Sequence, residues 1–135
     1  MIIILALSIE PFTAWSQKHQ APAPQRNFMI FFNWNSAVIS PRDKELIAQA
    51  AMNAKNLMGL QGKVQVRGYM DTSMSLQKSA ILSEGMAKAV RDELVHDGIH
   101  VDRIDYSGQG KTQLLKQTRD AVREPVNRRV EIRIQ

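Results

Sequence analysis

Asp71 is the residue whose type and position in the chain are best suited to bind a ligand. It follows a predicted strand that ends at Tyr69 and precedes a predicted helix that begins near Ser75. The first turn of a helix has backbone N–H groups without intrahelical partners, so polar side chains and charged ligands often gather there. Two interpretations of Asp71 are therefore open: a turn-forming or capping carboxylate, or a carboxylate that contacts a ligand.

Basic side chains crowd the last quarter of the chain. They are Lys111, Lys116, Arg119, Arg123, Arg128, Arg129 and Arg133, with only Asp120, Glu124 and Glu131 among them. Together with a net charge of +5, they favour anionic partners such as nucleic acid, an acidic glycopolymer or an anionic membrane surface. Nucleic-acid binders usually interleave such charges with exposed aromatic side chains, which this region lacks. A solvated basic face is the preferred interpretation, and no nucleic-acid partner is expected.

Residues that could support catalysis do not group in this sequence. The chain has no cysteine, which removes disulfides, thiolate metal sites and cysteine nucleophiles. The histidines His19, His96 and His100 show no spacing typical of metal ligands. The segment 108–112 lacks the first glycine of a phosphate-binding loop, because Asp105 stands in its place. We expect no enzyme, no metal and no cofactor.

The first half of the domain has the pattern of a strand followed by a helix. Residues 28–32 form a short apolar run typical of a buried strand. Ser40 and Pro41 are a capping residue and a first-turn proline, so a helix should begin there. Apolar residues then recur at spacings of three and four up to Met58, and Gly59 is a suitable end.

A second strand and a second helix follow. Residues 63–69 alternate in polarity, which predicts a strand buried on one side. A helix is expected from about Ser75 to Asp97, with Gly98 as its C-terminal cap. Gly85 in its middle costs up to about 1 kcal/mol relative to alanine, so something other than helix propensity placed or tolerates it.

The end of the chain adds two strands, at 104–107 and 129–134. The long basic loop between them is predicted to form a short helix over Leu114–Arg123. The order strand, helix, strand, helix, strand, strand predicts an α+β fold. It is a two-layer β-α-β-α-β-β sandwich with a mixed sheet and both helices on one face.

The N-terminal region is expected to lie outside this domain. Residues 1–16 form a short apolar run that ends at a small-x-small triplet, typical of a signal peptide, although no Lys or Arg precedes it. An apolar strand or a misassigned start codon are the alternatives. The run is shorter than the roughly 18 to 20 residues of a membrane-spanning helix. Residues 17–26 have the composition of a polar linker, which leaves 27–135 as the folded domain.

Three segments, in the right order and spacing, resemble the OmpA-like peptidoglycan-binding domain family: Val64–Thr72, Ile81–Val90 and Asn127–Ile132. Two family motifs are altered, so the chain resembles a divergent member. The family's Phe-Asp-x-Asp strand end is Phe32-Asn33-Trp34-Asn35 here, without the charges. Its Leu-Ser-x-Arg-Arg-Ala is Leu82-Ser83-Glu84-Gly85-Met86-Ala87, without either arginine.

The resemblance implies a binding site for diaminopimelate, the zwitterionic residue of the peptidoglycan stem peptide. Asp71 would contact its ammonium group, and an arginine fifteen residues later would clamp its carboxylate with paired hydrogen bonds. Met86 occupies the position of that arginine. The ligand-binding residues implied by the family are Asp71, Arg128, Arg129, Asn33, Thr72, Ser79 and Met86.

The same resemblance implies a non-enzymatic module of the cell envelope. It would lie in the periplasm of a Gram-negative bacterium, associated with the outer membrane only indirectly. It would bind the peptidoglycan stem peptide weakly, because Met86 replaces the arginine, and protein partners in the envelope are also expected. The alternative is a divergent structural or protein-interaction domain that has lost peptidoglycan binding.

Overall fold

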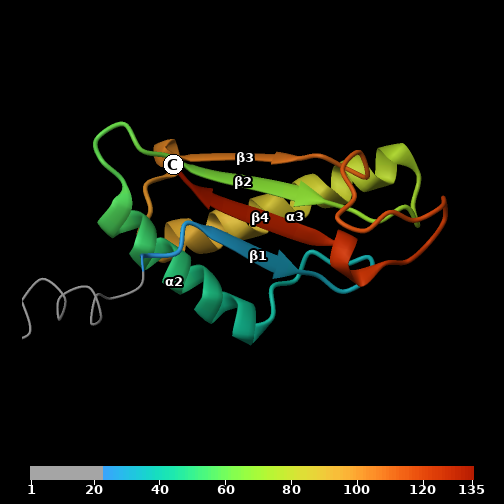
Figure 1. The fold of residues 1–135 in the computed structure, drawn as a ribbon, viewed down its shortest axis with the longest axis horizontal. Coiled ribbons are helices and arrows are strands. Elements are labelled where there is room, and N and C mark those ends of the chain that lie inside the picture. Colours follow the sequence, from blue (N-terminus) through green and yellow to red (C-terminus); the bar gives the residue numbers. More distant parts are fainter. Residues whose placement is uncertain (1–22) are drawn as a thin grey trace, which may run out of the picture.

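A four-stranded sheet backed by two helices forms the architecture of the computed structural model, which describes residues 23–135 (Figure 1). The elements are β1 (Asn27–Phe31), α2 (Pro41–Leu57), β2 (Val64–Tyr69), α3 (Leu76–His96), β3 (Ile104–Gly108) and β4 (Arg129–Ile134). This order confirms the predicted α+β sandwich. The expected signal peptide and most of the expected linker lie outside the described residues. None of the described helices is long and apolar enough to span a membrane.

The sheet is mixed, as predicted, with the strand order β1-β4-β2-β3. Strand β4 lies between β1 and β2 and runs antiparallel to both. Strands β2 and β3 are parallel, because α3 carries the chain across between them. Strand β4 therefore occupies a central position in the sheet, and Asn127 and Arg128, just before it, are buried.

One face of the sheet is covered by both helices and forms the core. The buried strand residues alternate along each strand and include Phe28, Ile30, Val64, Val66, Val130, Ile132 and Ile134. The helices contribute their apolar stripes, which include Ile47, Ala50, Ala51 and Ala54 from α2, and Met86, Ala87, Val90 and Leu94 from α3. On the other face, Met29 and Phe31 remain about half exposed.

Both helices begin at the serines that the sequence indicates. The Ser40 hydroxyl accepts a hydrogen bond from the backbone N–H of Asp43 at 3.1 Å. The Ser75 hydroxyl likewise accepts a hydrogen bond from the backbone N–H of Lys78 at 3.2 Å. Helix α3 ends before Gly98, whose φ of +98° lies in the left-handed region that favours glycine. These caps fix the position of α3 along the sheet.

Helix α3 lies unusually close to β2 and β3 because two strand residues have no side chain. A Cβ atom on Gly68 would lie 2.0 Å from the Ser83 carbonyl oxygen, and one on Gly108 would lie 2.3 Å from the Glu84 nitrogen. The Ser83 hydroxyl also accepts a hydrogen bond from the Gly110 N–H at 2.9 Å. Gly85 differs from these two glycines, because the space around it is open.

The prediction of a short helix over Leu114–Arg123 is wrong. This segment consists of turns and bends, and a short 3-10 helix, Pro125–Asn127, precedes β4. Its backbone groups bind partners outside the segment instead of each other: the Ala121 N–H donates to the Thr72 carbonyl at 3.0 Å, and the Lys116 N–H donates to the Asn127 side chain at 2.8 Å. A second 3-10 helix, Val101–Arg103, was not predicted.

Candidate ligand-binding site

Asp71 and Arg128 form a buried ion pair at the end of the sheet. The Arg128 Nη1 atom lies 2.8 Å from Asp71 Oδ2, and the two side chains are 9% and 0% exposed. Arg128 Nε also donates a hydrogen bond to the Phe32 carbonyl at 3.2 Å. The pair joins three chain segments that are distant in the sequence: the end of β1, the loop after β2 and the start of β4.

The Asp71 carboxylate accepts four hydrogen bonds. Oδ2 accepts from Arg128 and from the Glu124 N–H at 3.1 Å. Oδ1 accepts from the Ser73 N–H at 3.1 Å and from the Ser73 hydroxyl. An ionised carboxylate has about four acceptor positions, so no position remains for a ligand ammonium in this arrangement.

The same contacts explain the acidity of Asp71. Burial by itself raises its pKa, since it disfavours the charged form. The hydrogen bonds from the Ser73 and Arg128 side chains, and from the Ser73 and Glu124 backbone N–H groups, outweigh burial and lower the pKa below its usual value. Asp71 is therefore a charged, fully partnered group that holds the Ser73 loop against residues 124–128.

The two predicted arginines lie on different sides of the sheet. Arg128 shares a shallow hollow of about 390 Å³ with Asn33, beside Pro125 and Val126. Arg129 lies on the face that the helices leave open, with its guanidinium carbon 4.2 Å from the centre of the Tyr69 ring. Neighbouring residues of an extended chain point to opposite sides. The structure thus brings Arg128 to both Asp71 and Asn33, and it separates Arg129 from them.

The other three predicted residues have little or no access to solvent. The Thr72 hydroxyl donates to the Arg119 carbonyl at 2.7 Å and accepts from the Val122 N–H at 3.0 Å, so it anchors the loop before β4. Ser79 is fully buried, and Met86 packs in the core at 0% exposure. The position of Met86 lies in the hydrophobic core, and an apolar side chain is suited to it.

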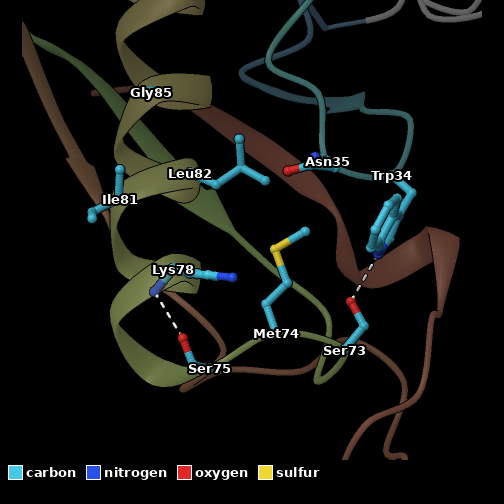
Figure 2. A pocket seen from close by; sticks show the side chains of 9 residues that line it. All are labelled: Trp34, Asn35, Ser73, Met74, Ser75, Lys78, Ile81, Leu82 and Gly85. Atoms are coloured by element: carbon cyan, nitrogen blue, oxygen red, sulfur yellow. Dashed lines mark hydrogen bonds between the residues drawn. The ribbon is translucent and has the colours of Figure 1, made fainter.

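A groove of about 740 Å³ lies between the loop after β1 and the first half of α3 (Figure 2). Its lining residues are Trp34, Asn35, Ser73, Met74, Ser75, Lys78, Ile81, Leu82 and Gly85. None of them is among the ligand-binding residues that the family resemblance implies. One signal was present, because Lys78, Leu82 and Gly85 have the i, i+4, i+7 spacing of a single helix face.

Trp34 forms one wall of the groove and is held from two sides. Its indole N–H donates to the Ser73 hydroxyl at 3.1 Å (Figure 2). The Arg123 guanidinium carbon lies 3.5 Å from the centre of its ring, a cation–π contact. Since Ser73 in turn donates to Asp71, a chain of hydrogen bonds connects the groove wall to the buried ion pair.

A second cluster of titratable groups lies at the far end of α3. Ligand atoms of Glu93, His96 and Asp97 lie within 4.8 Å of one another, a grouping that the histidine spacing did not predict. His96 is largely exposed. The Lys55 ammonium donates to the Asp97 carbonyl at 2.6 Å, and a cation so close disfavours a bound metal ion.

The fold, the groove and the buried ion pair define a small binding domain. The chain belongs to the OmpA family, whose model matches residues 31–128. Domains of this family are non-enzymatic modules, in agreement with the expectation from the sequence.

Two similar curated proteins are named as outer membrane proteins. The chain is 34% identical over 118 residues to an outer membrane protein of Gluconacetobacter diazotrophicus, covering 83% of this chain and 31% of that protein. It is 33% identical over 99 residues to outer membrane protein A of Shigella flexneri, covering 68% of this chain and 28% of that protein. The chain thus spans about a third of the length of these curated relatives.

Solved structures show the same fold. The peptidoglycan-associated lipoprotein of Burkholderia pseudomallei has a TM-score of 0.71 at 22% identity, covering 82% of this chain and 91% of that one. The OmpA-like domain of FopA1 from Francisella tularensis has a TM-score of 0.69 at 24% identity, covering 81% and 73%. The C-terminal domain of Helicobacter pylori MotB also has a TM-score of 0.69, at 22% identity, covering 78% and 81%.

Proposed function

We propose that this chain is a peptidoglycan-associated module of the Gram-negative cell envelope and acts in the periplasm. Membership of the OmpA family supports the proposal, as do relatives named as outer membrane proteins and a fold shared with a peptidoglycan-associated lipoprotein. The observation that carries it is the groove at the start of α3, whose Trp34 wall is tied through Ser73 to the buried Asp71.

The groove suits one stretch of a stem peptide. Trp34, Met74 and Leu82 offer apolar surface for aliphatic parts of the ligand, including the side chain of diaminopimelate. Asn35, Ser73 and Ser75 add polar groups along the same walls. Such a mixture of apolar walls and a few polar groups is typical of sites that bind small ligands.

Asp71 and Arg128 act in this proposal by positioning the groove. Their ion pair holds the Ser73 loop beside residues 124–128, and Ser73 holds Trp34. Asn33 and Arg128 line the adjoining hollow, where a longer ligand would continue. A direct contact between Asp71 and the ligand would require Ser73 or Arg128 to release the carboxylate.

Binding through the groove should be weak. Met86 is buried in the core and Gly85 has no side chain, so neither position of the family's arginine pair supplies a guanidinium to the groove. A charge-assisted contact of this kind contributes about 1.5 to 3 kcal/mol, which is roughly ten- to a hundredfold in affinity. We therefore expect detectable but weak association with stem peptides that contain diaminopimelate.

A second candidate is a protein-interaction domain that has lost peptidoglycan binding. It is favoured by the full occupancy of the Asp71 carboxylate and by the half-exposed Met29 and Phe31 on the open face of the sheet. In this case the groove would be a remnant of the family's site.

Sedimentation with purified peptidoglycan sacculi separates the two candidates. The natural chain should sediment with sacculi, and Trp34→Ala should lose most of this binding. Leu60→Ala is the matched control, because Leu60 is almost fully exposed and does not line the groove. Absence of binding would favour the protein-interaction domain. Binding that is unchanged by Trp34→Ala but falls steeply with salt would indicate non-specific attraction to the basic surface.

A further inference from the structure

Lys78 is the one charged residue among those that line the groove in the described part of the chain. Its ammonium forms no ion pair with any described residue. Figure 2 shows its side chain extending from α3 toward Met74 and the space in front of Trp34. Two further cations lie behind the groove walls and are engaged: Arg123 stacks on Trp34, and the Lys111 ammonium donates to the Met74 carbonyl at 2.8 Å. The groove therefore offers a ligand one free positive charge from its lining residues, that of Lys78.

The groove offers no matching negative charge. The nearest candidate from the sequence, Asp71, is fully buried behind Ser73, and its four acceptor positions are occupied. A zwitterionic ligand would thus have its carboxylate matched by Lys78, while its ammonium would have no carboxylate to bind.

We propose that Lys78 is the residue that confers ligand specificity on this groove, and that the groove binds a stem peptide through a carboxylate and not through an ammonium group. This inference rests on the proposed association with peptidoglycan and names the charge that is recognised. Lys78, Leu82 and Gly85 share one face of α3. In this arrangement the aliphatic part of the ligand packs against Leu82.

The size of the effect follows from the exposure of Lys78. An exposed ion pair contributes less than a buried one, since water and salt screen it. We expect loss of the ammonium to weaken binding about five- to tenfold, a smaller effect than a bidentate arginine would give.

The test uses synthetic stem tripeptides that end in meso-diaminopimelate, in three forms: unmodified, with both diaminopimelate carboxylates amidated, and with its side-chain ammonium acetylated. Titration calorimetry should show an approximately five- to tenfold loss of affinity on amidation and a change of less than about twofold on acetylation. Lys78→Gln should reproduce the loss with the unmodified peptide and should bind the amidated peptide no more weakly than the natural chain does. Lys78→Arg should retain binding.

Lys88→Gln is the control for net charge, because Lys88 is an exposed lysine of the same helix that does not line the groove. Binding that weakens on acetylation, or that is equally sensitive to Lys78→Gln and Lys88→Gln, would overturn the inference but leave the peptidoglycan association standing. Absence of binding to both the unmodified peptide and sacculi would overturn both proposals. The melting temperatures of the Lys78 and Lys88 variants should equal that of the natural chain, so that a change in affinity reports binding and not unfolding.

Discussion

The guanidinium of Arg128 lies 2.8 Å from the carboxylate of Asp71, and at most 9% of either side chain is exposed. Charges are costly to bury, and this pair persists because each partner has further hydrogen bonds. The pair connects the loop that carries Ser73 with the start of the central strand. It is therefore the structural basis of the neighbouring groove.

Breaking this ion pair should destabilise the domain strongly. Arg128→Met should lower the free energy of unfolding by about 3 to 5 kcal/mol, because it leaves the Asp71 charge buried without its partner. Lys88→Ala should cost less than about 1 kcal/mol, since its pairing with Asp92 is exposed. Urea denaturation measures both. Equal losses in the two variants would show that burial does not set the strength of the Asp71 pair.

The stability of the domain should depend on pH through Asp71. Its pKa is lower in the folded than in the unfolded chain, where a value of about 3.9 is expected. Its contribution to stability is thus fully present above pH 4 and is lost as the pH falls through the folded-state pKa. The difference in unfolding free energy between the natural chain and Asp71→Asn should shrink below pH 4. A difference that stays constant from pH 7 to pH 2 would contradict this assignment.

Two glycines should respond in opposite directions to alanine. Gly85→Ala should stabilise the domain by up to about 1 kcal/mol, because the site is helical and the added methyl group meets open space. Gly68→Ala should destabilise it by about 1 to 3 kcal/mol, because the methyl group would overlap the backbone of α3 at Ser83. Thermal melts of the two variants provide the comparison. A destabilised Gly85→Ala variant would indicate that the groove closes on this residue.

The two positions of the lost arginine pair should also differ. Gly85→Arg should bring a guanidinium to the groove and raise the affinity for fragments that contain diaminopimelate by about tenfold. Met86→Arg should instead destabilise the domain by several kcal/mol, since it places a charge in the apolar core without a free partner. Calorimetry and urea denaturation measure the two effects. Higher affinity in a stable Met86→Arg variant would show that this side chain can reach the ligand after all.

Much of the fold could be predicted because the sequence patterns that mark its helices and strands are local. Ser40 and Ser75 cap the two helices, and the alternation of Val64 and Val66 marks a one-sided strand. Such patterns depend on neighbours within a few positions and on the period of the backbone. The segment 114–123 could not be predicted in the same way, because its backbone hydrogen bonds go to Thr72 and Asn127, which local patterns do not reveal.

The sequence by itself determined the order of the elements and the family, and it indicated Asp71 as a polar group at the start of the second helix. The tertiary structure alone decided that Arg128 turns inward to Asp71 while Arg129 lies on the open face of the sheet, and that Trp34 and Lys78 face one groove. The physical reason is the range of the interactions. A helix or strand is specified by residues a few positions apart, whereas the partner of a buried charge, here 57 positions along the chain, is set only when the sheet has assembled.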